Sequence, residues 1–416
     1  MRFHRTTKKF VQNELYKLCA GYDTTQIVGK YIHTSTWQPY DIIKRLIQAC
    51  LERTSLEDIC STTEGPSADT VHRRCSELQM NQIEKLVNGW LIEIVSRLKF
   101  HHTSKITLAF DLYEQPFYGD PSYDWVLGTQ YKKGTSYSIT YLVASIATQN
   151  IRCPVAVRLM TNRRVKTKVA VVSQILDDLF VWLPIKRVLF DRGFCQEDIL
   201  QLMQDRGVEY VIAAIRHGQV KRAAQEIHTC VKELARLAGV DVTDTLAVGR
   251  WARKQGLDTY RVEHVSTGKK RTPVPLVAAF VRKKTHHRDP LKRRVYCLYM
   301  YLTNCQLTPR SIVKLYSKRW IIETDLRCIN DFKAVTNSIQ PQLRLLLYGL
   351  AMVVDALWVV FSTLLSRLTE TEPFEITSET QFCIKQCDEL QCIARQFLRW
   401  LRTFIFPFLS FRGGNA

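Results

Sequence analysis

The chain has 416 residues, of which 46% are hydrophobic and 24% are charged. This profile is ordinary for a soluble globular protein, and the length is enough for two or three domains. The charge balance is not ordinary, because 59 Lys and Arg stand against 39 Asp and Glu and leave a net charge of +20. Such a field favours a polyanionic partner, most simply nucleic acid, although a generally basic proteome would give the same balance.

Several features point to a reduced, cytoplasmic protein without a membrane segment. The 13 cysteines lack the C-x-x-C spacing of a zinc site, and the N-terminus MRFHRTTKKFVQ lacks the apolar centre of a secretory signal. The most apolar stretch, residues 345–361, is interrupted by Asp355 and is shorter than the ~20 residues that span a bilayer. We therefore expect it to be a buried core helix.

Residues 1–100 predict a helical domain, with apolar residues three and four apart in KKFVQNELYKLC, DIIKRLIQACLE and NQIEKLVNGWLIEIVSRL. Between the second and third of these segments, Gly65-Pro66 breaks a short helix, and a new helix is expected to begin near Ser67. The pattern fits a helix-turn-helix that presents Arg73 and Arg74 to DNA, or equally an ordinary helical hairpin.

From residue 104 the pattern is that of an α/β core. KITLAFD predicts a strand that ends in Asp111, and IKRVLFD predicts another that ends in Asp191. The remaining elements are expected to be strands at 137–148, 151–160 and 209–215 and helices at 163–182 and 196–206.

The segment 216–294 differs from its surroundings in charge. It carries 19 Lys and Arg against 7 Asp and Glu, which accounts for 12 of the net +20. Short apolar, strand-like runs lie between basic clusters, as in GKKRTPVPLVAAFVRKKTHHRDPLKRR. We expect a β-rich insertion with a phosphate-binding face, the alternative being a set of solvated loops. Residues 294–304 then predict a strand that returns to the core.

Three carboxylates are candidates for one site. Asp111 and Asp191 end strands, where α/β sites are usually built, and Glu323 lies in YSKRWIIETD with Tyr316 and Arg319 at helical spacing on one face. Converging carboxylates repel one another unless cations neutralise them, and Mg²⁺ prefers oxygen ligands. Two such ions about 4 Å apart would hold both the attacking and the leaving oxygen of a phosphodiester. Turn residues, caps and local ion pairs are the alternatives for each acid.

These motifs resemble those of DDE-type insertion-sequence transposases of the Tyr-Arg-Glu signature group. The signature Y-(2)-R-(3)-E-(6)-K is read at Tyr316, Arg319 and Glu323, whereas its lysine position holds Asn330 and the nearest lysine is Lys333. LAFDLYEQPFYGD and VLFDRGF match the elements around the first and second acids, and the resemblance runs from about residue 104 to about residue 365.

The resemblance implies a ribonuclease H-like mixed sheet with flanking helices. Asp111, Asp191 and Glu323 would be catalytic and would bind two Mg²⁺ ions, or Mn²⁺ in their place. The partners would be double-stranded DNA at the terminal inverted repeats and the target, and a second copy of the chain in a homodimer. The setting would be prokaryotic cytoplasm, at the nucleoid. The residues expected to contact DNA are Tyr316, Arg319, Arg327, Lys333, Arg192, Arg73 and Arg74.

The implied activity is cleavage at the transposon ends and joining of the 3′-hydroxyls to target DNA. The alternatives are a metal-dependent nuclease that does not join strands and a transposase-derived DNA-binding protein without catalysis.

The expected organisation is a helical DNA-binding domain at 1–100, the first part of the catalytic core at 101–215, the basic insertion at 216–294, the remainder of the core with the Glu323 helix at 295–366, and a basic, aromatic, helical tail at 367–416.

Overall fold

A computed structural model of the chain describes residues 37, 39–62, 64–96, 98, 100, 105–148, 151–267, 272–284 and 294–369. The predicted N-terminal helix over residues 8–19 and the tail from residue 370 lie outside the described residues. The chain divides into two compact units. The first comprises Met1–His101, Leu112–Asn162 and Ile321–Ala416, and the second comprises His102–Asp111 and Arg163–Trp320.

The second unit is built on three parallel strands. β1 (Ile106–Pro116), whose first residues belong to this unit, pairs with β5 (Ile185–Phe190), and β5 pairs with β6 (Glu209–Ala213). β5 ends in the fully buried run Val188, Leu189 and Phe190, as is typical of parallel strands that are covered on both faces. The connecting elements are α7 (Val165–Phe180), the 3₁₀ turn η1 (Arg192–Phe194) and α8 (Glu197–Asp205).

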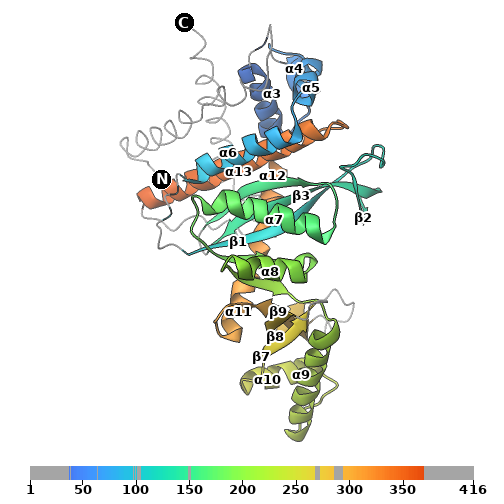
Figure 1. Cartoon of the computed structure of the whole chain (residues 1–416), viewed down its shortest axis with the longest axis vertical. Helices are drawn as coiled ribbons and strands as arrows, with labels where there is room; N and C mark the ends of the chain where they lie inside the picture. The colour runs from blue at the N-terminus through green and yellow to red at the C-terminus, as the bar shows by residue number, and fades with distance from the viewer. Residues whose placement is uncertain are drawn as a thin grey trace. The chain divides into compact units, whose positions relative to one another are not determined.

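The basic insertion belongs to this second unit and extends its sheet. β9 pairs antiparallel with β6 and with β8, and β8 pairs with β7. Two helices precede these strands and pack beside them (Figure 1), so the first half of the insertion is helical, which the predicted β-rich description does not include. The buried residues of the longer helix are Val220, Ala223, Ala224, Val231 and Ala235, which recur at helical spacing. The elements are α9 (Gly218–Leu237), α10 (Thr245–Lys254), β7 (Thr259–Thr267), β8 (Thr272–Lys284) and β9 (Arg294–Thr303).

Two helices, α11 (Pro309–Ser317) and α12 (Trp320–Asp331), replace the single helix that was expected to carry the Tyr-Arg-Glu residues. The amides of Lys318 and Arg319 donate to carbonyls three residues earlier, at 3.0 and 2.9 Å, so α11 ends in a tight turn. Such a turn keeps side chains three residues apart nearly aligned, as a helix does. The spacing in the sequence therefore does not reveal the break.

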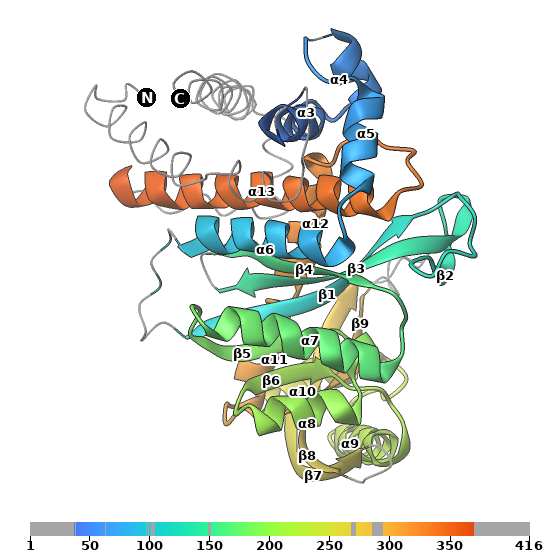
Figure 2. The ribbon, with the colours of Figure 1, turned by 45° about the horizontal axis from the view of Figure 1, so that its top comes forward.

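The first unit packs helices on an antiparallel sheet. α13 lies along α6 in both views (Figures 1 and 2). Gly349 permits this contact, because a Cβ there would lie 2.4 Å from Val87 Cγ2. Pro341–Val360 is long and apolar enough to cross a membrane, but 83% of its apolar window is buried, which confirms the predicted core helix. The elements are α3 (Pro39–Glu52), α4 (Leu56–Thr62), α5 (Ala68–Ser76), α6 (Met80–Ser96), β2 (Leu127–Lys132), β3 (Thr135–Ala147), β4 (Arg152–Met160), α12 and α13 (Pro341–Thr369).

The predicted helix start near Ser67 is confirmed. Ser67 is the N-cap of α5, and its hydroxyl accepts a hydrogen bond from the Thr70 amide at 3.3 Å. Gly65 has φ +145, and a Cβ there would collide with the guanidinium of Arg45, which is 2% exposed and donates to the Glu64 carbonyl. The interruption between α4 and α5 at Gly65-Pro66 thus makes room for the buried Arg45 side chain from α3.

The predicted fold class is confirmed. The nine strands of the described residues form a mixed sheet in the order β2-β3-β1-β5-β6-β9-β8-β7, with β4 also paired to β3. The parallel strands lie in the middle of this order and the antiparallel pairs towards its ends. This mixed sheet with flanking helices is that of a ribonuclease H-like core.

A buried ionic cluster joins α12 and α13 to β3 and β4 in the first unit. Asp325 is 0% exposed and accepts a hydrogen bond from Ser145 Oγ at 2.5 Å, while its other oxygen lies 3.2 Å from Arg152 Nε. Asp355, 1% exposed, also lies in this cluster, and burial raises the pKa of both carboxyls. Arg152 is thus the cation that permits carboxylate charge at this position.

Replacing Arg152 by Met should lower the free energy of unfolding by about 3–5 kcal/mol, because it leaves a buried carboxylate without its cation. Arg53→Met is the matched control. Arg53 also pairs with an aspartate of α12, Asp331 at 3.8 Å, but their side chains are 60% and 61% exposed. Its loss should cost less than about 1 kcal/mol. Urea denaturation measures both variants, and equal losses would contradict the structural role of the cluster.

Candidate active site

Asp111 and Asp191 lie on adjacent parallel strands. Asp191 directly follows the last residue of β5, whereas Asp111 lies within β1, which continues to Pro116, so the prediction that this strand ends at Asp111 is wrong. The last matched pair of β1 and β5 is Phe110 with Phe190, and each aspartate is the next residue along its strand. Asp191 is the N-cap residue of η1, yet its side chain makes no capping hydrogen bond. The capping alternative therefore does not account for Asp191, and the strand register places the two aspartates beside each other, where the pairing of β1 with β5 ends.

One guanidinium lies beside both carboxylates. Arg319 Nη1 is 3.5 Å from Asp111 Oδ2, and Arg319 Nη2 is 4.0 Å from Asp191 Oδ1. The Arg319 side chain is only 8% exposed, whereas that of Asp191 is 45% exposed. Arg319 therefore brings a buried positive charge to a pair of like charges that would otherwise repel each other.

Tyr316 lies in the same unit and faces the same arginine. Its ring packs on Tyr301 of β9, with ring centroids 4.7 Å apart, and the Arg319 guanidinium carbon lies 5.8 Å from the ring centre. Burial, with Asp191 adding to its effect, raises the pKa of Tyr316 to about 12. The hydroxyl stays protonated at neutral pH and can donate a hydrogen bond to a phosphate oxygen.

Arg192 follows Asp191 directly and is exposed. It forms part of the wall of a cavity of about 330 Å³, together with Ala214, Ile215, Arg216, Cys297, Leu298, Tyr299 and Met300. Two arginines at one cavity beside an acidic strand end make this surface suitable for phosphate.

Lys168 was not anticipated from the sequence. It is 8% exposed, and its ammonium donates to the Gly193 carbonyl at 2.9 Å and lies 5.7 Å from the centre of the Phe194 ring. Lys168 thereby holds the Asp-Arg-Gly-Phe turn from α7. The only signal in the sequence is a lysine on the apolar face of that helix, one turn before Val172.

The other expected residues lie in the first unit. Glu323 is in the first turn of α12 and is partly exposed, and Arg327, one turn later, is exposed. Arg73 is exposed on α5, and the Arg74 guanidinium donates to Glu77 of the same helical end at 3.1 and 3.2 Å.

Asn330, at the position where the signature has lysine, and Lys333 share one partner. The Tyr113 hydroxyl donates to Asn330 Oδ1 at 2.5 Å, and Lys333 Nζ donates to the same hydroxyl at 3.4 Å. Burial, helped by the positive charges of Arg344 and Lys133, lowers the pKa of Lys333 to about 8. Lys333 lies just beyond the end of α12. Because it contacts the same hydroxyl as Asn330, its partly desolvated ammonium lies close to the position where the signature has lysine.

The two aspartates fit a divalent ion by their donor chemistry. Mg²⁺ takes carboxylate oxygens and keeps several waters, so two carboxylates at one sheet edge are a suitable partial ligand set. The guanidinium beside them shows that the site accommodates positive charge. Within the described ranges, no group of three or more His, Cys, Asp or Glu side chains is close enough to hold an ion.

The comparisons with known proteins agree with this geometry. The family model described as transposase DDE domain matches residues 99–353, which is more than half of the chain. The comparison with curated proteins gives no match. The matched region begins before β1 and ends within α13, so it contains both aspartates, Tyr316, Arg319 and Glu323. The chain therefore belongs to the transposase DDE domain family.

Proposed function

We propose that the chain is a DNA transposase that cleaves at the terminal inverted repeats of its element and joins the 3′-hydroxyl ends to target DNA. The observation that carries the proposal is the pair Asp111 and Asp191, which lie next to each other on two paired parallel strands, both within 4.0 Å of one buried arginine, in a member of the DDE family. Members of this family act on DNA and generally use divalent metal ions.

In this proposal Asp111 and Asp191, with Glu323 as the third acid, hold two Mg²⁺ ions, for which Mn²⁺ can substitute. The bound ions would lower the pKa of the attacking hydroxyl or water and neutralise charge on the phosphodiester. Strand pairing fixes the backbone positions of the two aspartates, so these would not need to move when the substrate arrives.

The basic and aromatic residues would position the DNA. Arg319 can give a forked pair of hydrogen bonds to phosphate oxygens, and Tyr316 can donate a third from a hydroxyl that stays protonated. Arg192, beside the second acid, would hold a neighbouring phosphate. We assign Arg327 and Lys333 to the same DNA end, with Lys333 in the role of the signature lysine.

Two further parts of the chain would bind DNA at a distance from the cleaved phosphodiester: the N-terminal helices of the first unit, and the basic insertion. Arg73 and Arg74 lie at the last turn of α5, the second helix of the candidate helix-turn-helix. The surplus of positive charge in residues 216–294 suits a phosphate-binding face. Pairing of two transposon ends would require a homodimer on DNA, in the cytoplasm at the nucleoid.

Asp191→Asn should abolish both excision and strand joining, with a loss of at least about 10²-fold, because it removes a fixed carboxylate from the metal site. The assay uses purified protein, Mg²⁺ and a plasmid that carries the element's terminal inverted repeats. Asp198→Asn, an exposed acid in the first turn of α8, is the matched control and should retain activity.

The outcomes of this assay separate the alternatives. Excision that survives Asp191→Asn would refute the assignment of the acids. Nicking by the wild type without joining under varied conditions would indicate a nuclease. Specific binding without nicking would indicate a DNA-binding protein that has lost catalysis.

Arg319→Gln should tighten Mn²⁺ binding by the DNA-free protein about three- to tenfold, because it removes a cation that competes for Asp111 and Asp191. Electron paramagnetic resonance of free Mn²⁺ measures the affinity without any need for activity. Arg192→Gln removes the same charge from an exposed side chain and should change the affinity less. Equal effects of the two variants would contradict direct competition by Arg319.

Lys333→Met should stabilise the protein at pH 7 by up to about 3 kcal/mol, because the wild type must hold a charged ammonium in a partly desolvated position. The pKa of Lys333 is about 8 in the folded chain and near 10.4 in the unfolded one. The unfolded chain therefore binds more protons between these values, and wild-type stability rises with pH across this window. The advantage of the variant should shrink accordingly and be lost above about pH 10.

Denaturation at pH 7 and pH 10 measures this change, with the exposed Lys85→Met as the control. A Lys333→Met variant with no pH-dependent advantage would show that burial, Arg344 and Lys133 do not lower the pKa of this lysine. Binding of a transposon-end duplex should weaken in the same variant, if Lys333 contacts phosphate as proposed.

A further inference from the structure

Helix α11, which carries Tyr316 near its end, rests mainly on the basic insertion. It packs on β7 and β8 as well as on the core strand β6. Its buried residues are Ile312, Leu315 and Tyr316, and the Tyr316 ring meets Tyr301 of β9. The insertion therefore supports the helix that carries Tyr316 of the signature.

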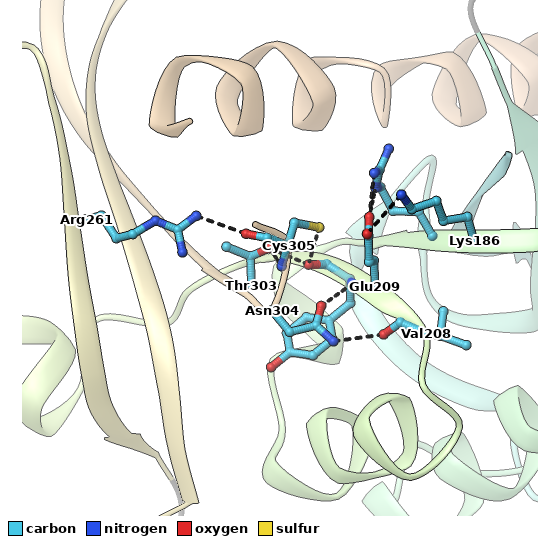
Figure 3. Close-up of polar contacts among 9 residues, drawn as sticks. Lys186, Val208, Glu209, Arg261, Thr303, Asn304 and Cys305 are labelled. Carbon is cyan, nitrogen blue, oxygen red and sulfur yellow. Dashed lines mark hydrogen bonds and ion pairs between the residues drawn. The ribbon is translucent and has the colours of Figure 1, made fainter. Parts of the chain in front are cut away.

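One side chain of the insertion fixes the start of this helix. Arg261 on β7 donates from Nη2 to the carbonyl of Cys305 at 2.9 Å and to that of Leu307 at 2.8 Å. Both carbonyls lie immediately before Thr308, the N-cap of α11. Figure 3 shows Arg261 extending from its strand to the Cys305 carbonyl. Hydrogen bonds from a charged donor to carbonyls are stronger than neutral ones, so this contact restrains where α11 begins.

The segment between β9 and α11 is also hydrogen-bonded to the core strand β6 and the residue before it. Thr303 Oγ1 donates to the Tyr210 carbonyl at 2.6 Å, and Asn304 bridges the Tyr210 amide and the Val208 carbonyl at 2.7 and 2.9 Å (Figure 3). The chain between β9 and α11 is thus held between the core and the insertion. A change at Arg261 frees one side of it.

The restraint at the start of α11 also affects the position of its C-terminal end, where Tyr316 lies. The helix has nine residues, so it is about 13 Å long at 1.5 Å per residue. A small tilt at its start displaces Tyr316 and the following Arg319, and a shift of about 1 Å in a positioning group can cost about 10²-fold in rate.

We infer that Arg261 is a positioning residue, through which the insertion sets the placement of Tyr316 and Arg319. The inference rests on the proposed function, because it gives the insertion a part in cleavage beyond the binding of DNA. Arg261 itself need not touch DNA, since its guanidinium is occupied by two carbonyls of its own chain.

The test compares Arg261→Gln with Arg250→Gln in the full-length protein. Arg250 is an exposed arginine of α10 that contacts a carbonyl of its own helix, so its loss removes the same charge from the insertion without touching α11. Arg261→Gln should slow single-turnover cleavage about tenfold or more. Binding of the transposon-end duplex should change no more than in Arg250→Gln. Arg261→Lys, which keeps a charged donor, should recover part of the rate.

Two readouts separate positioning from a general loss of stability. Arg261→Gln should increase amide hydrogen exchange in α11 and through Arg319 while α7 and α8 stay as protected as in the wild type. In an Arg319→Gln background, Arg261→Gln should add little further loss of rate, because both act through the same contact. Unchanged exchange in α11, or fully additive losses, would overturn the inference.

The exchange measurement also separates this inference from the proposed function. A wild type that does not cleave DNA refutes the transposase proposal, and exchange in the DNA-free protein still decides whether Arg261 holds α11. Normal cleavage by Arg261→Gln beside slowed cleavage by Arg319→Gln would instead overturn the inference alone.

Discussion

The candidate site depends on the contact of one guanidinium with two carboxylates. Parallel pairing of β1 and β5 places Asp111 and Asp191 side by side, and two carboxylates at one sheet edge require a cation. In the protein alone Arg319 supplies that charge from 3.5 and 4.0 Å. The same requirement makes the pair suitable for divalent metal, and in the proposed function Arg319 would then be displaced and become available to the phosphate that accompanies the metal.

The Tyr-Arg-Glu segment is divided between the two compact units, because the boundary between them lies after Trp320. Tyr316 and Arg319 belong to the second unit, where α11 rests on the insertion strands. Glu323 belongs to the first unit, on α12, which the buried Asp325–Arg152 pair fixes to β4. The segment 316–323 is therefore a junction, and each side of it is held by its own buried contacts.

The sequence predicted the features that depend on local rules. The strand end before Asp191, the cap at Ser67 and the buried α13 each follow from a short pattern and are present. The strand that carries Asp111 does not end there but continues to Pro116. The break between α11 and α12 was missed because a three-residue turn preserves the spacing of a helix. The helix α9 was missed although its buried residues recur at helical spacing, because the prediction for residues 216–294 relied on their charge and on the strand-like runs of their second half. The positions of Lys168 and Arg261 depend on contacts between distant strands and helices, and no local pattern encodes those.

The departure from the signature at Asn330 is best understood through the hydroxyl of Tyr113. A lysine at 330 would place a charge on the face of α12, whereas this chain has a neutral amide there that accepts from Tyr113. Lys333 approaches the same hydroxyl from beyond the helix end, so charge returns to the site from a different backbone position. Its lowered pKa means that the ammonium is incompletely solvated in the free protein. In the proposed function a bound phosphate would offset that desolvation, so Lys333 would gain more from the contact than an exposed lysine would.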